Sequence, residues 1–508
     1  MQQRAITIGA VLCLLAAADS RADGPALGHP QFRPSSARPI GFRGDWTGCY
    51  PGANPVTAWD IKRGINVRWR VPTRTFSNAV PLIVGEKLLV NCEPAVLACL
   101  DKMTGKLLWA RDIGAGATTQ TATRPLSLPP QSVVAMEPIA PLWSERKLSY
   151  GQWSGMSIAT PVCNGQFVWV KSGSMAACFD LDGNRKWVTR THLIATDHPM
   201  NVPSPTLADG VLICEGGVSP YWQQNTRNKI PDGVLPPNRN AKFQHWMVGL
   251  DAATGKLLWD LGPLNSGGYG GPASPITVTL GAADASTSYV LTGEGCLIRP
   301  RDGKIVNPWV GTRGPFASPV PLAGVGALGV PHRKVSMVEL SPAGADRVDA
   351  TVRWENPRGC GFGGVAIGNG LANTITIEKE ARVNVIDLAT GQSTFVGLVP
   401  QMLTADLNDW PSPAAAGSYV FLFTSHRVAV LEAGRTPKLV AINEVERTHG
   451  GPAFDGDRMY LRSYDSIMCI GLTGEEGARY EQQVRAAAPA LTALHPTTAS
   501  RPTTAGGR

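Results

Sequence analysis

The side chains best suited to bind a ligand stand just before a series of recurring prolines. Arginine and histidine bind anions through charge-assisted hydrogen bonds, and aromatic side chains supply flat apolar walls. The candidates are Arg74, Asn78, Asn201, Tyr269, Arg313, Arg358, Asp409, Trp410, Arg447 and His449, with Ser77, Phe316 and Phe362 in the same segments. If the fold gathers these segments, they predict a site for an anionic or carbohydrate-like ligand. The alternative is that they are solvated turn residues.

No familiar catalytic or metal-binding pattern accompanies this set. Cys92 and Cys99 are not close to any histidine, so they do not form a zinc pattern. The glycine-rich run 359–364 lacks the Lys-Ser/Thr pair and the following helix of a phosphate loop. No Gly-x-Ser-x-Gly elbow occurs. We therefore predict no catalytic residue and no metal ligand, and we interpret His449 taken alone as an ordinary loop histidine.

The composition indicates an exported protein with many short elements. Of the 508 residues, 56 are glycine and 41 are proline, which favours strands joined by tight turns over helices. Arg4, the apolar stretch 5–18 and the small residues around Ala22 are typical of a secretory signal, so we expect residues 1–22 to be cleaved near Ala22. The alternative is a buried N-terminal helix. The remaining sequence has no stretch long and apolar enough to span a membrane.

The charge and the cysteines exclude some partners and leave disulfide bonding open. The net charge of +8 is scattered over the chain, which does not favour a nucleic-acid partner. Of ten cysteines, nine remain after the predicted cleavage, and an odd number cannot all pair within one chain. Several cysteines recur at equivalent places in the repeats described below, which suggests small buried apolar residues more than paired or reactive sulfurs.

The elements that position the candidate residues belong to an internal repeat. Residues 97–109 contain Asp101, Gly105 and Trp109, and residues 247–259 contain Asp251, Gly255 and Trp259 at the same spacing. Shorter copies lie at 177–187 and 385–391. We expect a strand that ends at the aspartate, a tight turn that needs glycine at a positive φ, and a second strand that carries the tryptophan.

A second half of the repeat precedes each such turn. It consists of a small residue, a proline and a glycine, followed by a strand-forming run, as in residues 81–90 and 161–170. Eight such starting points occur, mostly 39 to 49 residues apart, which matches the length of a four-stranded propeller blade. Two longer intervals contain insertions at 112–155 and 215–245. We predict an all-β, eight-bladed β-propeller, with seven blades as the lesser alternative.

The two chain ends are expected to close the ring. The last copy of the repeat has no tryptophan strand, and the segment 66–71 before the first copy supplies one. Pairing these segments would remove exposed sheet edges. We expect the repeated aromatic residues to pack between neighbouring blades. They are Trp69, Trp109, Trp187, Trp259, Trp309 and Trp354, with Phe395 as a substitute.

The Asp-x-x-Thr-Gly-Lys-Leu-Leu-Trp signature and the Ser/Ala-x-Pro-x-x-x-Gly strand resemble the pyrroloquinoline-quinone repeat. This repeat is shared by quinoprotein dehydrogenases and by the outer-membrane β-barrel assembly lipoprotein, so the resemblance implies fold more than function. The segment that starts at Arg43 resembles the leader of secreted members with quinone-binding-like repeats. The dehydrogenases typically use an adjacent-cysteine disulfide, calcium ligands and an Asp base. We find no adjacent cysteines, no matching calcium ligands and no Cys-x-x-Cys-His haem motif.

The resulting expectation is a binding or assembly platform without catalysis. In a propeller, the loops that follow each outer strand and the loops between the second and third strands emerge on one face. Both insertions and all candidate site residues fall there. We expect no cofactor, an envelope or extracellular protein or glycan as partner, and a monomer. The alternative is a quinoprotein dehydrogenase with the quinone and calcium. Residues 23–42 are expected to be a flexible lead-in, 43–474 the propeller, and 475–508 a disordered tail.

Overall fold

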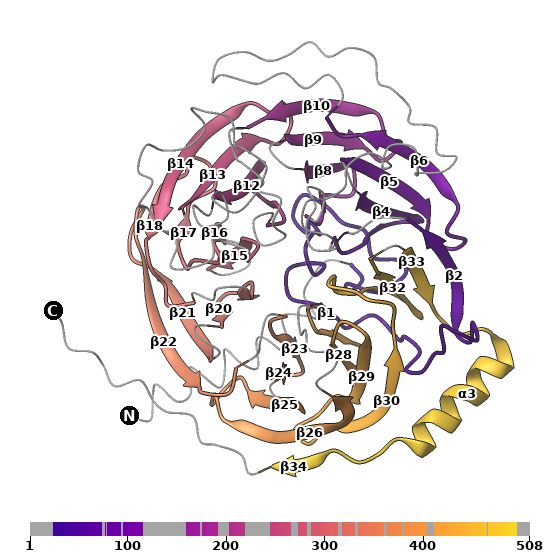
Figure 1. Ribbon diagram of the computed structural model, residues 1–508. Coiled ribbons are helices and arrows are strands. Elements are labelled where there is room, and N and C mark those ends of the chain that lie inside the picture. Colours follow the sequence, from indigo (N-terminus) through magenta and orange to yellow (C-terminus); the bar gives the residue numbers. More distant parts are fainter. Residues whose placement is uncertain are drawn as a thin grey trace.

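The chain forms eight four-stranded antiparallel sheets that are arranged as blades around one axis (Figure 1). The computed structural model describes residues 24–73, 77, 79–92, 95–114, 159–172, 175–191, 203–218, 244–265, 273–281, 286–312, 317–330, 334–359, 363–377, 380–403, 411–464 and 466–494. The predicted eight-bladed β-propeller is therefore confirmed, and the seven-bladed alternative is wrong. Both predicted insertions fall largely on residues outside the described ranges.

Each blade runs from an inner to an outer strand in chain order. In blades 1 to 4 the strands are β3 (Leu82–Val84), β4 (Lys87–Cys92), β5 (Val96–Asp101) and β6 (Leu107–Asp112); β7 (Val162–Cys163), β8 (Phe167–Ser172), β9 (Met175–Asp180) and β10 (Arg185–Arg190); β11 (Thr206–Ala208), β12 (Val211–Val218), β13 (Gln244–Asp251) and β14 (Leu257–Asn265); and β15 (Ile276–Leu280), β16 (Thr287–Leu291), β17 (Leu297–Ile298) and β18 (Ile305–Asn307).

Blades 5 to 8 follow the same order. Their strands are β19 (Val320–Leu322), β20 (Gly326–Gly329), β21 (Val335–Pro342) and β22 (Val348–Asn356); β23 (Ala366–Gly368), β24 (Leu371–Ile377), β25 (Glu380–Asp387) and β26 (Ser393–Leu403); β27 (Ala414–Ala416), β28 (Tyr419–Phe423), β29 (Arg427–Glu432) and β30 (Lys438–Glu444); and β31 (Ala453–Asp455), β32 (Arg458–Arg462), β33 (Ser466–Ile470) and β2 (Val67–Pro72). The outer strand of blade 8 comes from the start of the chain: β2 pairs with β33, with Trp69 opposite Cys469. The ring therefore closes by pairing the two ends of the repeat region.

The aspartate of the repeat builds the turn between the third and fourth strands. In blade 1, Asp101 Oδ1 accepts hydrogen bonds from the backbone N–H of Met103 (3.0 Å) and of Thr104 (2.8 Å). Gly105 closes the turn at φ +72°, a conformation that side chains rarely adopt. Asp251 and Gly255 make the same turn in blade 3. This turn fixes where the outer strand, with its tryptophan, begins.

Five tryptophans of the repeat lie between neighbouring blades, each against a turn glycine of the next blade. A Cβ built on Gly255, for example, would lie 2.5 Å from the ring of Trp187. The pairs are Trp69 with Gly105, Trp109 with Gly183, Trp187 with Gly255, Trp259 with Gly303, and Trp354 with Gly391. Each indole N–H also donates to a backbone carbonyl of the next blade.

Trp309 does not follow this pattern, contrary to the expectation from the sequence. Its side chain is 54% exposed and it comes after β18 rather than within it. The next blade joins β21 to β22 through residues 343–347, without the Asp and Gly spacing of the other turns. A Cβ on Gly344 would meet no atom within 4 Å. The tryptophan therefore lacks the glycine platform on which the others pack.

In blades 2 to 5, the serine or threonine before the recurring proline links the inner strands of successive blades. The backbone N–H of Val80 donates to Thr160 Oγ1 (2.9 Å), and that of Thr160 donates to Ser204 Oγ (2.9 Å). The series continues from Ser204 to Ser274 and from Ser274 to Ser318. All four hydroxyl-bearing residues are buried. This chain of hydrogen bonds explains why serine or threonine recurs at this place in the sequence.

The N-terminal segment is packed against the ring, whereas we expected residues 23–42 to be a flexible lead-in. Ile40 forms a β-bridge with Cys163 of blade 2, and β1 (Cys49–Tyr50) pairs in parallel with β27 of blade 7. Leu27 is buried, and the Gly28 carbonyl accepts the N–H of Gly456 in blade 8. The described part of the lead-in covers the face formed by the turns between first and second strands. The indigo trace in Figure 1 follows this segment across the ring.

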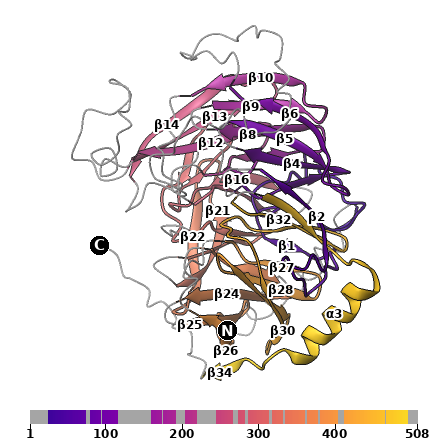
Figure 2. The same ribbon diagram turned by 45° about the vertical axis from the view of Figure 1, so that its right-hand side comes forward.

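The C-terminal segment also differs from the expectation of a disordered tail from residue 475. Helix α3 (Gly474–Ala487) lies beside β30, and β34 (Thr492–Leu494) adds a fifth strand to blade 6, at the bottom of Figure 2. Tyr480 and Val484 pack against the main core. The composition of the last residues suggested disorder, but these two apolar side chains anchor the helix. Residues 495–508 lie outside the described ranges.

Asn66 joins the two ends of the chain beside α3 and gives a first prediction. It is fully buried at φ +58°. Its Nδ2 donates to the Ala58 carbonyl (2.8 Å), and its Oδ1 accepts the N–H of Thr473 (3.0 Å). We expect Asn66→Ala to lower the free energy of unfolding by about 2–3 kcal/mol, because it loses these bonds and strains the backbone. Denaturant unfolding checks this. Asn66→Gly, which relieves the strain, should cost less; equal costs would contradict the account.

Candidate functional site

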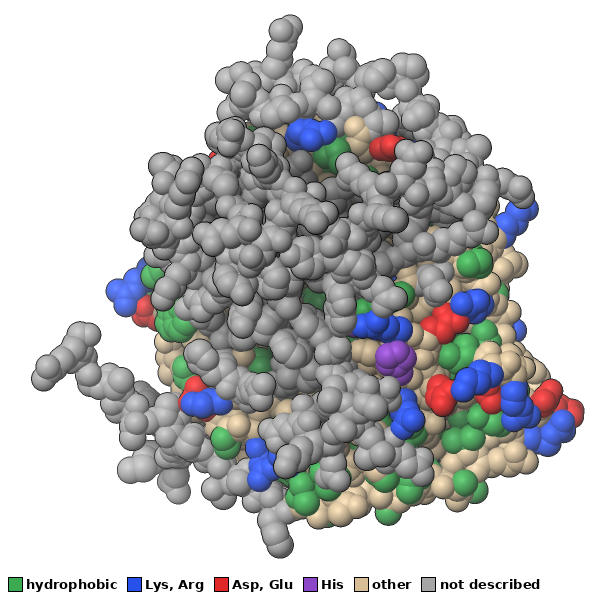
Figure 3. Space-filling view, viewed as in Figure 1, with side chains coloured by type: hydrophobic (Ala, Val, Ile, Leu, Met, Phe, Trp, Pro, Cys, Tyr) green, Lys and Arg blue, Asp and Glu red, His purple; other side chains and the backbone are tan. Residues whose placement is uncertain are grey.

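The candidate site is the face of the ring that carries the loops leading into each blade (Figure 3). Of the predicted site residues, Arg358, Arg447 and His449 are described. The others, which are Arg74, Asn78, Asn201, Tyr269, Arg313, Asp409 and Trp410, lie outside the described residues. Among the described side chains of this view, a histidine and basic groups lie near the centre over blades 7 and 8, and acidic and basic groups gather at the lower right, where α3 lies. Two of the three described candidates, Arg447 and His449, lie on the loop between these two blades.

Arg447 and His449 come together with Tyr464, which the sequence reasoning missed. The loop from β30 to β31 carries the first two residues, and the loop from β32 to β33 carries Tyr464. Tyr464 Oη lies 2.9 Å from His449 Nε2, and the two rings meet edge to face with centroids 5.0 Å apart. The Arg447 guanidinium lies 4.8 Å from the centre of the Tyr464 ring. The Tyr464 N–H donates to the Arg447 carbonyl (2.9 Å), which holds the two loops together.

This group does not have the pKa values of a proton-transfer site. Burial, together with the nearby charges of Arg447 and His426, lowers the pKa of His449 to about 3. Burial raises the pKa of Tyr464 to about 12. Both side chains are therefore neutral near pH 7, whereas a general acid or base works best with a pKa near the working pH. Arg447 keeps a positive charge on the aromatic surface, which suits an anionic ligand.

The buried neutral His449 gives a pH prediction. Its pKa is depressed in the folded chain relative to about 6.5 in the unfolded chain. Between pH 6.5 and about 3 the unfolded chain binds more protons, so the stability that this group contributes is lost as pH falls through that range. We expect His449→Gln to weaken the loss of stability between pH 7 and pH 4.5, as measured by denaturant midpoints. Parallel pH profiles for the two proteins would contradict it.

The Glu446 carboxylate lies next to the Arg447, His449 and Tyr464 group. Its contacts fix the loop that carries Arg447 and His449. Glu446 accepts hydrogen bonds from Ser463 (2.8 Å) and Ser466 (2.5 Å) and forms an ion pair with Arg70 at 2.6 Å. Burial alone would raise the pKa of Glu446, but these bonds outweigh it and lower the pKa. The carboxylate is thus fully engaged in holding the two loops of blades 7 and 8 to β2.

Arg358 belongs to a separate group, on the loop from β22 to β23. Its backbone is fixed by two asparagines: its N–H donates to Asn356 Oδ1 (3.0 Å), and its carbonyl accepts Asn384 Nδ2 (2.7 Å). The next carbonyl, of Gly359, accepts Thr376 Oγ1 (2.7 Å). The structure thus places one predicted arginine between blades 5 and 6 and the other between blades 7 and 8, on loops of the same face.

The N-terminal segment packs against the ring from the face opposite the candidate site. Arg43 is buried, and its Nη2 donates to the carbonyls of Val365 in blade 6 and Pro413 in blade 7 (3.2 Å for the latter). Trp46 is also buried and packs with core residues of blades 2 to 5. Both residues have positive φ values, +59° and +69°, which is unusual for residues other than glycine. The segment therefore contacts both halves of the ring from the face opposite the candidate site.

The cysteines and acidic groups bear on the prediction that the protein has no metal ligand. The eight described cysteines are free thiols, and seven of them are buried. Burial raises the pKa of Cys99 and of Cys163 to about 12, so these thiols are not poised to react. Over the described ranges, no three His, Cys, Asp or Glu side chains converge as they would around a metal ion. The absence of a metal ligand stays a prediction for the whole chain.

Fold and repeats together define the class: the chain is an eight-bladed β-propeller with repeats like those of the pyrroloquinoline-quinone family. No protein-family model and no curated protein matches the sequence. BamB from Moraxella catarrhalis is 10% identical at TM-score 0.46 and covers 80% of this chain and 100% of its own. A quinohemoprotein alcohol dehydrogenase from Comamonas testosteroni is 11% identical at TM-score 0.43, covering 92% and 85%. Likenesses this distant do not indicate a ligand or an activity.

No helix in the described part of the chain has the length and apolar character needed to cross a membrane. This covers α3, which is 14 residues long and carries Glu475, Glu476 and Arg485.

Proposed function

We propose that this protein is a non-catalytic binding or assembly platform whose ligand or partner docks on the loop face around Arg447 and His449. The observation that carries the proposal is the His449, Tyr464 and Arg447 group. It offers a fixed cation on an aromatic surface, while its titratable neighbours are held neutral or in an ion pair. Such a surface binds an anionic or carbohydrate-like group but lacks an acid or base at a useful pKa.

The proposal includes export and the absence of a cofactor. The first 22 residues have the composition of a secretory signal, so the partner would be an envelope or extracellular protein or glycan. Propeller loops often carry binding sites because a rigid ring positions them. The alternative is a quinone-dependent dehydrogenase with calcium, which is supported only by the type of repeat.

Reconstitution tests the alternative directly. The purified full chain is incubated with pyrroloquinoline quinone and Ca²⁺ and assayed with alcohols and sugars and a dye acceptor. The platform proposal expects no turnover above that of the protein without quinone. Quinone-dependent turnover that follows the protein concentration would contradict it.

Capture from a cell-envelope extract tests the docking surface. We expect immobilised protein to retain a specific protein or glycan, and Arg447→Ser to reduce the recovered amount at least several-fold, because it removes the cation from the loop face. Arg347→Ser is the matched control: Arg347 is 72% exposed in the turn between β21 and β22, on the opposite face. Equal recovery with both variants, or no recovery with the unaltered protein, would contradict the proposal.

A further inference from the structure

One position of the repeat carries ionisable or amide side chains in four neighbouring blades. In each of these blades, the residue that follows the recurring proline pairs with a residue of the second strand. The position lies two residues further along that second strand. In blades 8, 1, 2 and 3 it is occupied by Arg462, Asn91, Lys171 and Glu215, and all four are buried. In blades 4 to 7 it is occupied by Gly293, Val330, Ile375 and Phe423. An apolar or small residue is thus compatible with the fold at this position, and half of the ring departs from that pattern.

These four side chains form a series in which each interacts with a group of the next blade. Arg462 Nη1 lies 3.5 Å from the Cys92 sulfur in blade 1. Asn91 Nδ2 donates to the carbonyls of Ala159 and Lys171 in blade 2, both at 3.0 Å. The Lys171 ammonium interacts electrostatically with Glu215 of blade 3, and Glu215 interacts with Glu294 of blade 4. We call Arg462, Asn91, Lys171, Glu215 and Glu294 the polar arc.

The polar arc lies at the loop end of the inner strands. Asn91, Lys171 and Glu215 stand near the ends of β4, β8 and β12, and Glu294 stands between β16 and β17. These strand ends lead into the loops of the candidate face. The arc and the proposed docking face therefore belong to the same end of the ring.

The Lys171 ammonium and the Asn91 side-chain oxygen are buried without a hydrogen-bond partner in the described structure. Lys171 is 2% exposed, and no described group accepts from its ammonium; Asn91 Oδ1 receives no donor. Leaving such groups unpartnered is costly, particularly for a charged group. Burial lowers the pKa of Lys171 to about 8, which still leaves most molecules charged at pH 7. The nearby Glu215 carboxyl has its pKa raised well above its usual value by burial and by Glu294.

We infer that the polar arc is a binding site for a small hydroxylated carboxylate, of which an acidic sugar is the simplest carbohydrate example. A carboxylate on the ligand would accept from Lys171, and a ligand hydroxyl would donate to Asn91 Oδ1. The inference rests on the proposed function, because it names the ligand class of the same face.

The stability of Lys171→Met separates a ligand-binding role from a structural one. Methionine has a similar shape without the buried charge, so the variant should raise the Tm of the ligand-free protein by a few degrees. Lys186→Met is the control, because Lys186 is 41% exposed on the outer strand of the same blade and pairs with Asp180. It should leave the Tm unchanged or slightly lower. A fall in Tm for Lys171→Met would show that the ammonium stabilises the fold and would overturn the inference.

Thermal titration with galacturonate and galactose then tests the ligand class. We expect galacturonate to raise the Tm of the unaltered protein, galactose to have a much smaller effect, and Lys171→Met to lose at least most of the response to galacturonate. No response of the unaltered protein, or an equal response of the variant, would overturn the inference. Neither result depends on the capture experiment with Arg447→Ser. Failure of the polar-arc inference is therefore distinguishable from failure of the platform proposal.

Discussion

Replacing Trp187 by alanine is expected to lower the free energy of unfolding by about 3–5 kcal/mol. The side chain is 5% exposed, lies against Gly255 of the next blade and donates its indole N–H to the Ala252 carbonyl at 3.0 Å. Removing it leaves a cavity between blades 2 and 3, and the Ala252 carbonyl keeps only its other donor, the indole N–H of Trp169 at 2.8 Å. Gly255 has no side chain with which to fill the space, and close-packed interiors close such cavities only in part.

Trp309→Ala is the matched control for this experiment. The same residue type at the corresponding end of an outer strand is 54% exposed, so its removal should cost less than about 1 kcal/mol. Both variants are measured by chemical denaturation against the unaltered protein. Equal costs would show that packing on the turn glycine is not what stabilises the contact between blades.

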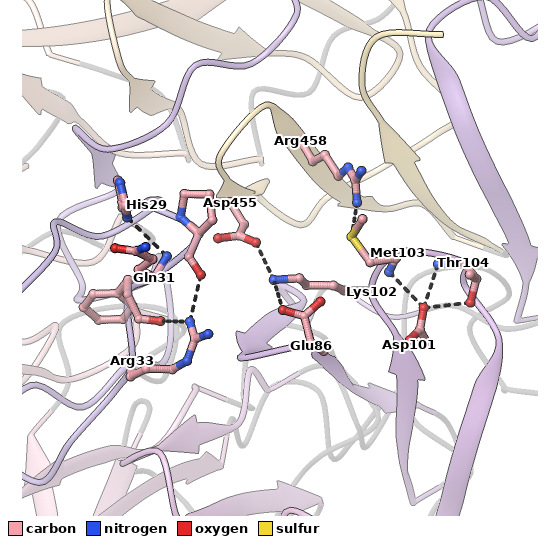
Figure 4. Close-up of polar contacts among 12 residues, drawn as sticks. His29, Gln31, Arg33, Glu86, Asp101, Lys102, Met103, Thr104, Asp455 and Arg458 are labelled. Carbon is pink, nitrogen blue, oxygen red and sulfur yellow. Dashed lines mark hydrogen bonds and ion pairs between the residues drawn. The ribbon is translucent and has the colours of Figure 1, made fainter.

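Replacing Asp455 by alanine is expected to lower the free energy of unfolding by about 3 kcal/mol, since it leaves a buried ammonium without its main partner. Asp455 in blade 8 pairs with Lys102 in blade 1 at 2.7 Å, and their side chains are only 13% and 5% exposed. Glu86 approaches the same ammonium at 3.2 Å but is mostly exposed (Figure 4). This ion pair spans the junction where the last blade meets the first.

Glu444→Gln serves as the comparison for the ion pair. Glu444 pairs with Lys62 at 2.6 Å, but both side chains are well exposed. Solvent and salt screen such a pair, so its loss should not change the denaturation midpoint measurably. The account would be contradicted if this variant were as unstable as Asp455→Ala, or if Asp455→Ala unfolded like the unaltered protein.

The ring was predictable because its determinants are local. Asp101, Gly105 and Trp109 define a turn and a strand within 13 residues, and the same spacing recurs at Asp251, Gly255 and Trp259. The serine or threonine before the proline of blades 2 to 5 also has a local sequence signal, although its partner is in a neighbouring blade. Trp309 was misjudged because its environment depends on the turn of the following blade, which is not visible in its own repeat.

The chain ends could not be predicted in the same way. The lead-in is held by contacts such as Ile40 with Cys163 and Gly28 with Gly456, which join residues far apart in the sequence. Helix α3 depends on Tyr480 and Val484 meeting the core. Such contacts leave no periodic pattern, so composition suggested flexible segments at both ends.

The site was predictable only in part. The segment before the proline led to Arg447 and His449, whose role as ligand-binding residues stays a prediction, and Tyr464 lies in another loop with no repeated signal. The polar arc does have a signal, since Lys171 and Glu215 replace the apolar residues found at the same repeat position in other blades. Aligning the repeats by strand pairing, rather than by proline alone, is what reveals it.

The most direct test of the account is site-specific photocrosslinking from the two faces of the ring. A photoreactive residue replaces His426, which is exposed on the loop between β28 and β29, or Lys106, which is exposed on a turn of the opposite face. After irradiation in cell-envelope extract, we predict a discrete crosslinked product from position 426 and none from position 106. Products from position 106 alone, or the same products from both positions, would contradict a platform that binds through its loop face.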